Sequence, residues 1–265
     1  MGLRVRQFRR QLGLASALAL CVLLSGAVSG NGSDGELPPP DREFRFARLA
    51  YNGNFMDRGF RGGESWRTDA PEAEYHLLMG LRRLTRIDAI DPQRERFIAV
   101  SALDPNLYEF PFLYAVEVGR WHLDDEEANA MREYLERGGF LMVDDFHGSE
   151  QWEGFMQSLR RVFPEREVVD IPDDHEVFHV LYDLNQKVQI PGIYSVMRGT
   201  TYEEDGYDPH WRGVFNDHGR LMVAINFNMD LGDAWEHADD PEYEQPLTAL
   251  AYRFAVSYAL YAMTH

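Results

Sequence analysis

Residues 112–143 read FLYAVEVGRWHLDDEEANAMREYLERGGFLMV, and this stretch decides the fold class. Its two ends, 112–118 and 140–143, are apolar runs of the kind that form buried strands. Between them, Asp124 and Glu127 make the pattern of a capping box, an apolar helical face follows, and two glycines end the helix. A strand, a helix and a strand at this spacing predict two parallel strands joined by a crossover helix.

The same alternation continues over the rest of the chain. Further strands are predicted at 44–50, 97–101, 167–171, 193–197, 213–215 and 221–225, and further helices begin near residues 71, 149 and 246. The segments after residue 190 lack long crossover helices, so we expect the sheet to gain antiparallel strands there. The sequence therefore predicts an α/β fold with a mostly parallel sheet, helices on both faces, and antiparallel additions near the C-terminal half.

The chain carries a large excess of acidic residues. Its 265 residues include 44 Asp and Glu against 26 Lys and Arg, a formal net charge of −18, and 45% of them are hydrophobic, enough for a folded core. Affinity for nucleic acids comes largely from neutralised phosphates, so this composition disfavours a nucleic-acid partner. We expect a small polar ligand or an envelope protein as the partner instead.

The N-terminus has the order of a secretory signal. Four arginines within the first ten residues precede an apolar run at 12–24 and a stretch of small residues. This run is shorter than the about 20 residues that a membrane span needs, although a retained signal anchor stays open. We predict a signal peptide at 1–30, a proline-rich linker at 31–42, and a single periplasmic or secreted domain at 43–265 with no membrane span in the mature chain.

Ligands of parallel α/β folds bind beyond the carboxyl ends of the strands. This rule selects three loops, which follow Val118, Val143 and Ile225. The second loop begins with Asp144 and Asp145 and continues to His147. Adjacent carboxylates repel each other and raise a pKa, and a carboxyl group beside a histidine suits acid–base catalysis or metal ligation. We predict these three residues as catalytic, with capping of the next helix as the alternative role for the aspartates.

The loop after Ile225 lies in an acidic region, since residues 200–245 hold 12 acidic and 2 basic side chains. Its predicted ligand-binding residues are Asn228, Asp230, Asp233, Trp235 and Glu236. Oxygen ligands at this density could bind calcium or magnesium, and an indole with polar neighbours suits a sugar. The alternative is a solvated acidic surface.

The segment from His175 to His179 reads HEVFH and matches the zinc-peptidase pattern H-E-x-x-H. On a helix, the two histidines would share a face and could hold zinc, with Glu176 as the base. The apolar neighbours of this segment favour a packing role as the competing interpretation.

Several segments together resemble one known family. They read GGFLMVDD at 138–145, GRLMV at 219–223 and NMDLGDAWE at 228–236, and they are similar to the family called domain of unknown function 4159. The likeness spans residues 44–265. The family itself resembles the class I glutamine amidotransferase-like superfamily, which implies a three-layer, flavodoxin-like sandwich. The only cysteine, Cys21, lies in the predicted signal, so the amidotransferase nucleophile is not implied.

We therefore expect an acidic, polar cleft formed by the loops after Val143 and Ile225. A neutral polar ligand such as a carbohydrate fits its charge, and a divalent cation is the cofactor that its oxygens would take. Binding alone and hydrolysis are both open at this point. A zinc metallopeptidase and a non-catalytic envelope interaction module are the alternative functions.

Overall fold

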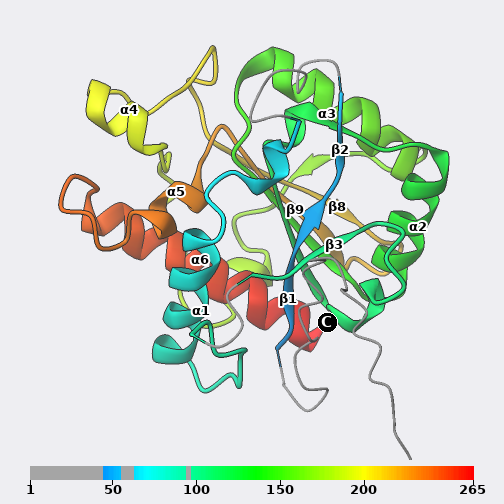
Figure 1. Ribbon diagram of the computed structural model, residues 1–265, viewed down its shortest axis with the longest axis horizontal. Helices are drawn as coiled ribbons and strands as arrows, with labels where there is room; N and C mark the ends of the chain where they lie inside the picture. The colour runs from blue at the N-terminus through cyan, green and yellow to red at the C-terminus, as the bar shows by residue number, and fades with distance from the viewer. Residues whose placement is uncertain (1–43, 55–62, 94–96) are drawn as a thin grey trace, which may run out of the picture. The chain divides into compact units, whose positions relative to one another are not determined.

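The computed structural model describes residues 44–54, 63–93 and 97–265 (Figure 1). The predicted signal peptide and linker lie outside these ranges. Among the helices within them, none combines the length and the apolar content needed to cross a membrane.

A seven-stranded sheet organises the described chain, in the order β3-β1-β4-β6-β9-β8-β7. Its strands are β1 (Phe46–Ala50), β3 (Ala99–Ser101), β4 (Phe112–Val116), β6 (Phe140–Asp144), β7 (Val169–Asp170), β8 (His210–Phe215) and β9 (Leu221–Phe227). Neighbouring strands from β3 to β9 are parallel, whereas β8 is antiparallel to both β9 and β7. A separate antiparallel ribbon pairs β2 (Asn52–Gly53) with β5 (Trp121–His122). The predicted parallel sheet with antiparallel additions is confirmed.

Helices cover both faces of the sheet. They are α1 (Glu72–Leu84), α2 (Asp125–Glu136), α3 (Gly148–Val162), α4 (Ile193–Arg198), α5 (Leu231–Glu236) and α6 (Gln245–Thr264). Short 3₁₀ helices are η1 (Ser65–Arg67), η2 (Leu107–Glu109), η3 (Val118–Arg120) and η4 (Glu176–Phe178). Figure 1 shows α1 and α6 on one side of the sheet and α2 and α3 on the other. The predicted three-layer arrangement is present.

Strand β4 shows how the sequence builds two cores from one sheet. Side chains of a strand alternate between its faces. Phe112 and Tyr114 pack with α1, α5 and α6, whereas Leu113 and Ala115 pack with α2 and α3. Every residue of β4 is buried, as its continuous apolar sequence predicts.

The predicted capping box fixes the start of α2. The carboxylate of Asp124 accepts a hydrogen bond from the backbone N–H of Glu127, and the Glu127 carboxylate accepts one from the N–H of Asp124, both at 2.9 Å. Gly138, with φ of 115°, then takes the left-handed conformation that ends the helix and leads into β6.

One local prediction is wrong. The predicted strand at 193–197 is the helix α4, because Gly192 and Gly199 bracket it and Gly199 closes it with φ of 71°. The helix predicted to begin near residue 149 is present and begins at Gly148, with His147 as its N-cap. The short helix α5, inside what the sequence predicts as a loop, is an addition that pattern analysis missed.

Candidate functional site

Three neighbouring strands end at the same edge of the sheet and turn sharply. The residues that follow β4, β6 and β9 are Glu117, Asp145 and Asn228, with φ of 51°, 51° and 63°. Such left-handed conformations cost about 1–3 kcal/mol for residues other than glycine and gather at functional sites. The turns are held together, because Glu117 N–H donates to the Asp145 carbonyl at 2.9 Å and Asp145 N–H to the Met229 carbonyl at 3.1 Å.

Asp144 fastens the loop after β9 to the end of β6. Its Oδ2 accepts hydrogen bonds from the backbone N–H groups of Leu231 and Gly232, at 2.7 and 3.0 Å, and from the Tyr114 hydroxyl at 3.1 Å. Burial raises the pKa of Asp144 to about 7, and these hydrogen bonds oppose the rise. Asp144 therefore holds the site together from within the core, where it is fully buried.

Asp69, Asp145 and Asp230 form a buried cluster of carboxylates. One oxygen from each lies within 4.8 Å of the others. Asp69 comes from the loop before α1, Asp145 follows β6, and Asp230 is the N-cap of α5, where it accepts a hydrogen bond from Asp233 N–H at 2.7 Å. Burial and mutual repulsion raise the pKa of all three carboxyl groups well above the usual value.

His147 lies beside this cluster and is also buried. Its Nε2 is 3.4 Å from Oδ1 of Asp145, and neither ring nitrogen has a hydrogen-bond partner among the described residues. Burial lowers the pKa of the imidazole, so the ring is neutral at neutral pH.

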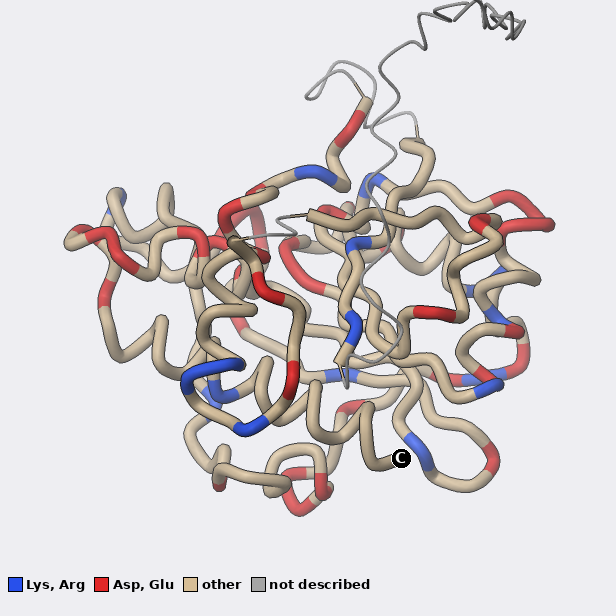
Figure 2. The backbone as a smooth tube through the Cα atoms, turned by 60° about the horizontal axis from the view of Figure 1, so that its bottom comes forward, with Lys and Arg blue, Asp and Glu red and all other residues tan. Residues whose placement is uncertain are grey.

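A pocket of about 580 Å³ opens next to His147. Its lining residues are Arg120, His147, Ser149, Glu150, Gln151, Glu204 and Asp205. Arg120 also donates to Glu117 at 2.9 Å, so its charge is partly neutralised at the pocket wall. Acidic residues recur throughout the described chain and basic ones are fewer (Figure 2).

A second pocket of about 330 Å³ shares Ser149 and Asp205 with the first. Asp205 anchors the shared wall, because its carboxylate accepts hydrogen bonds from the backbone N–H and the hydroxyl of Ser149, at 2.7 and 2.8 Å. The remaining wall includes Trp152, Tyr207 and His210. Tyr207 is 62% exposed, so its ring is available at the rim.

A family model described as Domain of unknown function (DUF4159) matches residues 45–263 of the chain. The chain belongs to this family. The match runs from β1 to the end of α6 and includes every candidate site residue. No curated protein matches the chain.

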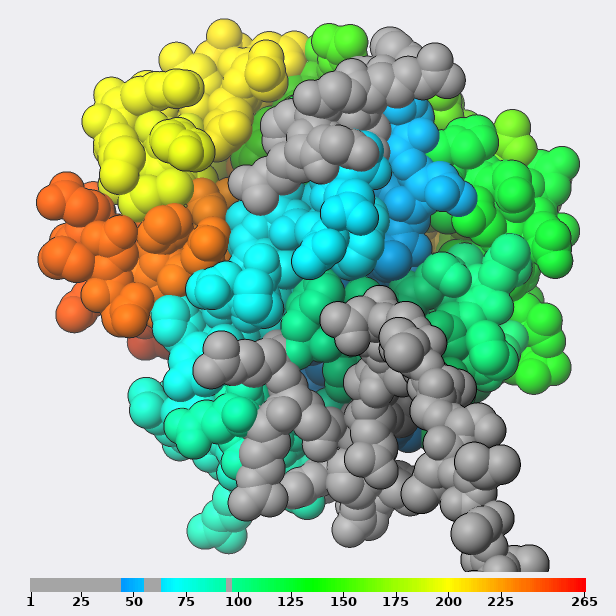
Figure 3. Space-filling view, viewed as in Figure 1, coloured from blue at the N-terminus to red at the C-terminus, as the bar shows by residue number. Residues whose placement is uncertain are grey.

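The DUF4159 domain brings the predicted acidic loops together. The segment around residues 190–210 lies against the one around 230–245 (Figure 3, yellow and orange). Ile193 N–H donates to Oδ2 of Asp233 at 2.6 Å, and Asp230 N–H donates to the Ile190 carbonyl at 2.9 Å. The loop after β6 contacts the loop after β9 as well, through the hydrogen bond from Asp145 N–H to the Met229 carbonyl, so both predicted acidic loops reach one edge of the sheet.

Two of the predicted ligand-binding residues, Asn228 and Trp235, make contacts within the protein that hold the fold together. Asn228 accepts a hydrogen bond from Gly148 N–H at 2.9 Å and donates to the Asp208 carbonyl at 2.7 Å, which ties three segments of the DUF4159 domain together. Trp235 is fully buried and packs on Tyr114 with ring centroids 5.4 Å apart. The sugar-stacking role predicted for Trp235 therefore has no exposed ring face to support it.

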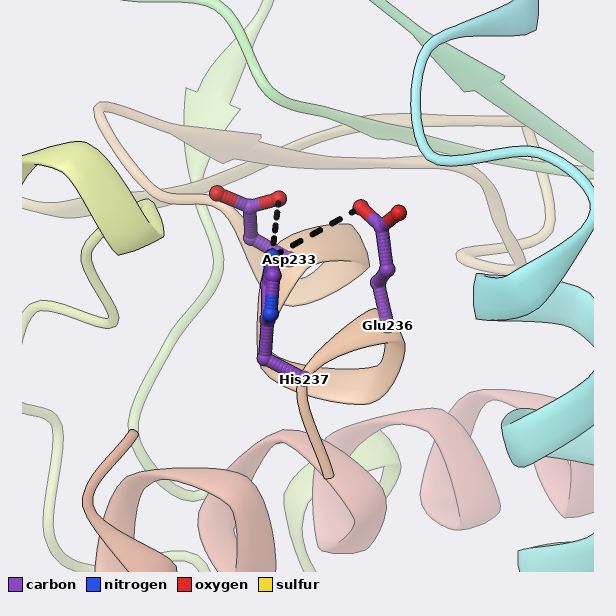
Figure 4. Close-up of side chains that lie close together, drawn as sticks. All are labelled: Asp233, Glu236 and His237. Atoms are coloured by element: carbon purple, nitrogen blue, oxygen red, sulfur yellow. Dashed lines mark ion pairs between the residues drawn. The ribbon is translucent and has the colours of Figure 1, made fainter. Parts of the chain in front are cut away.

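Asp233, Glu236 and His237 form a second group of potential metal ligands near the end of α5 (Figure 4). Nε2 of His237 lies 3.9 Å from both carboxylates, and its Nδ1 lies 3.3 Å from Oδ2 of Asp240. The group is partly exposed, and its histidine is surrounded by acidic partners. These three side chains could ligate a cation.

The H-E-x-x-H segment does not form the predicted helix. Its centre is the three-residue 3₁₀ helix η4, so the geometry that would put both histidines on one α-helical face is missing. His175 Nδ1 accepts a hydrogen bond from Val177 N–H at 3.2 Å, and His179 Nδ1 lies 3.0 Å from Oδ1 of Asp183. The helix on which the alternative zinc site depends is therefore absent from this segment.

Asp69 is the site residue that sequence reasoning missed. Its only signal was its place at a helix start, which is typical of a cap. It is separated from Asp145 and Asp230 by long stretches of sequence, and only the parallel sheet brings the three together.

Proposed function

We propose that the DUF4159 domain binds a neutral, carbohydrate-like ligand in the pocket beside His147 and hydrolyses it. The observation that carries this proposal is the buried imidazole at the wall of a 580 Å³ pocket, with both ring nitrogens unpartnered by the described residues. Buried polar atoms are normally satisfied, so a group left open at a pocket wall favours a role with a bound molecule.

The charge of the pocket favours a neutral ligand. Glu150, Glu204 and Asp205 line it against the one basic side chain, Arg120. Carboxylates accept hydrogen bonds from hydroxyl groups and repel anions. A molecule rich in hydroxyl groups therefore fits this wall better than a phosphate or a uronate does.

The adjoining pocket supports a ligand longer than one sugar unit. It shares Ser149 and Asp205 with the first pocket and adds the exposed ring of Tyr207. An amphipathic aromatic ring at a rim can cover the apolar face of a sugar. The ring of Tyr207 thus takes the sugar-stacking role that the sequence predicts for Trp235.

His147 is placed to move a proton during hydrolysis. The imidazole can accept a proton from a water whose oxygen bonds to the anomeric carbon, and it can then return that proton to the oxygen of the departing sugar as the glycosidic bond breaks. Asp145, 3.4 Å away, can orient the ring and stabilise its charged form. Asp144 makes its hydrogen bonds inside the core and would act only by holding this loop in place.

An array of neutral and uronate-containing oligosaccharides tests the binding, and release of reducing ends from the neutral binders tests the hydrolysis. The matched variants are His147→Ala and His218→Ala, since His218 is an exposed turn residue. We expect neutral glycans to bind, H218A to keep the wild-type rate, and H147A to lose about 10²–10⁴-fold in rate while it still binds. Binding of acidic glycans alone, or equal rates for H147A and the wild type, would overturn the proposal.

We also propose that the domain acts outside the cytoplasm, on the strength of the N-terminal signal pattern. N-terminal mass spectrometry of the protein recovered from the periplasm or culture medium should find a start near residue 30. Recovery of the intact N-terminus only from the cytoplasm would contradict export.

A further inference from the structure

Of the carboxylates of Asp69, Asp145 and Asp230, only that of Asp145 takes part in the proton transfer proposed above, by orienting His147 and stabilising its charged form. We propose that they bind one divalent metal ion of the oxygen-preferring class, to which Mg²⁺, Ca²⁺ and Mn²⁺ belong. This inference goes beyond the proposed function, because it concerns the cluster itself and requires no carbohydrate.

The spacing of the cluster suits a metal ion. The three oxygens lie within 4.8 Å of one another. Oxygen ligands lie about 2.0–2.6 Å from Mg²⁺ or Ca²⁺, so two ligands on opposite sides of the ion are roughly 4–5 Å apart. Only small side-chain movements are needed to close the three carboxylates around an ion.

The cations near the cluster form their ion pairs with other carboxylates. Arg48, which is buried near Asp69 and opposes the rise in its pKa, pairs with Glu74 and donates to the carbonyl groups of Trp66 and Thr68. Arg120, whose charge acts on Asp145, pairs with Glu117. Buried charges are normally paired or coordinate metals, so a cation would complete this part of the fold.

Oδ2 of Asp69 supplies an independent indication of a ligand. Asp69 is only 7% exposed, and this oxygen has no hydrogen-bond partner in the described structure. A Cβ atom on Gly232 would lie 2.4 Å from Oδ2 of Asp69 and 3.4 Å from Oδ1 of Asp230. Both carboxylates therefore lie against Gly232, where a larger side chain would clash with Asp69.

A further carboxylate, that of Glu203, lies close to Asp230. A Cβ atom on Gly192 would lie 2.8 Å from Oδ2 of Asp230 and 2.9 Å from Oε1 of Glu203. Glu203 thus approaches the cluster from the loop after α4. Carboxylates alone favour Mg²⁺, Ca²⁺ or Mn²⁺ over Zn²⁺, which prefers nitrogen and sulfur ligands.

The experiment uses the full chain after removal of metal with a chelator. MgCl₂, CaCl₂, MnCl₂ and ZnCl₂ are added one at a time, and Tm and bound metal per chain are measured. We expect one of the first three to bind at one ion per chain and to raise Tm by about 5 °C or more at saturation. Zinc as the only bound ion, or no bound ion and no rise in Tm, would overturn the proposal.

Asp145→Asn and Asp230→Asn should abolish both the bound ion and the rise in Tm. The control Asp174→Asn, at an exposed aspartate, should keep both. Asparagine tolerates the left-handed backbone of Asp145 and can cap a helix as Asp230 does, so these variants should fold. Full metal binding by D145N and D230N would overturn the proposal.

The metal-free proteins provide a check on folding. D145N should have a higher Tm than the metal-free wild type, because it removes one charge from a repelling cluster. If D145N no longer shows the metal-induced rise in Tm but has a higher metal-free Tm than the wild type, the variant has lost a metal ligand and its fold is intact. Since H147A should bind the metal ion normally, the failure of hydrolysis and the failure of metal binding can be told apart.

Discussion

Oδ2 of Asp144, at the end of β6, accepts a hydrogen bond of 2.7 Å from the backbone N–H of Leu231, the first residue of α5. This contact joins segments 87 positions apart in the sequence. It fixes α5 against the end of the sheet, and so it sets where Asp230 lies relative to Asp145. The candidate site depends on this contact even though Asp144 itself is buried.

Asp144→Ala should destabilise the domain by about 2–4 kcal/mol. The variant leaves the amides of Leu231 and Gly232 buried without an acceptor, and each such group costs about 1–3 kcal/mol. Asp144→Asn keeps one acceptor oxygen and should lose much less. Urea unfolding followed by circular dichroism measures both, and equal midpoints for D144A and wild type would show that the contact is unimportant.

The metal-free protein should be more stable at pH 5 than at pH 8. The pKa values of Asp69, Asp145 and Asp230 are raised in the folded state, so the native protein binds more protons than the unfolded chain above about pH 4. Protonation of these groups in the folded state contributes stability that is fully present below the unfolded pKa values of about 4 and is lost as the pH rises through the folded values.

Urea midpoints between pH 5 and pH 8 in the presence of a chelator test this dependence. D145N should flatten it and D174N should not, since Asp174 is exposed. A midpoint that rises steadily from pH 5 to pH 8 in the chelated wild type would contradict the assignment of these carboxyl groups.

Arg48→Met should destabilise the domain by about 3–5 kcal/mol, because it leaves Glu74 buried without its partner. The double variant Arg48→Met with Glu74→Met should recover most of the loss, since apolar side chains can replace a buried ion pair. A double-mutant cycle of unfolding free energies measures the coupling. A double variant no more stable than R48M would show that Arg48 acts mainly through its carbonyl contacts with Trp66 and Thr68.

The double variant His175→Ala with His179→Ala should keep the metal content and the hydrolysis rate of the wild type. Neither histidine belongs to a group of converging metal ligands in the part of the chain that the structure describes. Metal analysis of the purified variant provides the measurement. Loss of stoichiometric zinc on this double substitution would revive the peptidase interpretation.

The sequence predicts the sheet well because its signals are local. The capping box at Asp124, the apolar run of β4 and the glycines before β6 each specify their own element. The rule for strand ends then selects the edge of the sheet at which the loops after β6 and β9 meet. The resemblance to the amidotransferase-like superfamily stays a prediction, whereas membership of the DUF4159 family is shown.

The arrangement of the site could not be predicted in the same way. Asp69 joins the cluster through tertiary packing, and no local pattern distinguishes it from an ordinary helix cap. Trp235 is buried because α5 forms where the sequence suggests a polar loop, and its indole packs on Tyr114 instead of facing solvent. Both outcomes depend on contacts between distant segments, which periodicity does not report.

The proposed metal site is tested most directly by anomalous diffraction from crystals of the full chain soaked in MnCl₂. We predict one strong anomalous peak from a bound Mn²⁺ ion, about 2.2 Å from carboxylate oxygens of Asp69, Asp145 and Asp230. A peak only at Asp233, Glu236 and His237, or no peak within the described part of the fold, would contradict it.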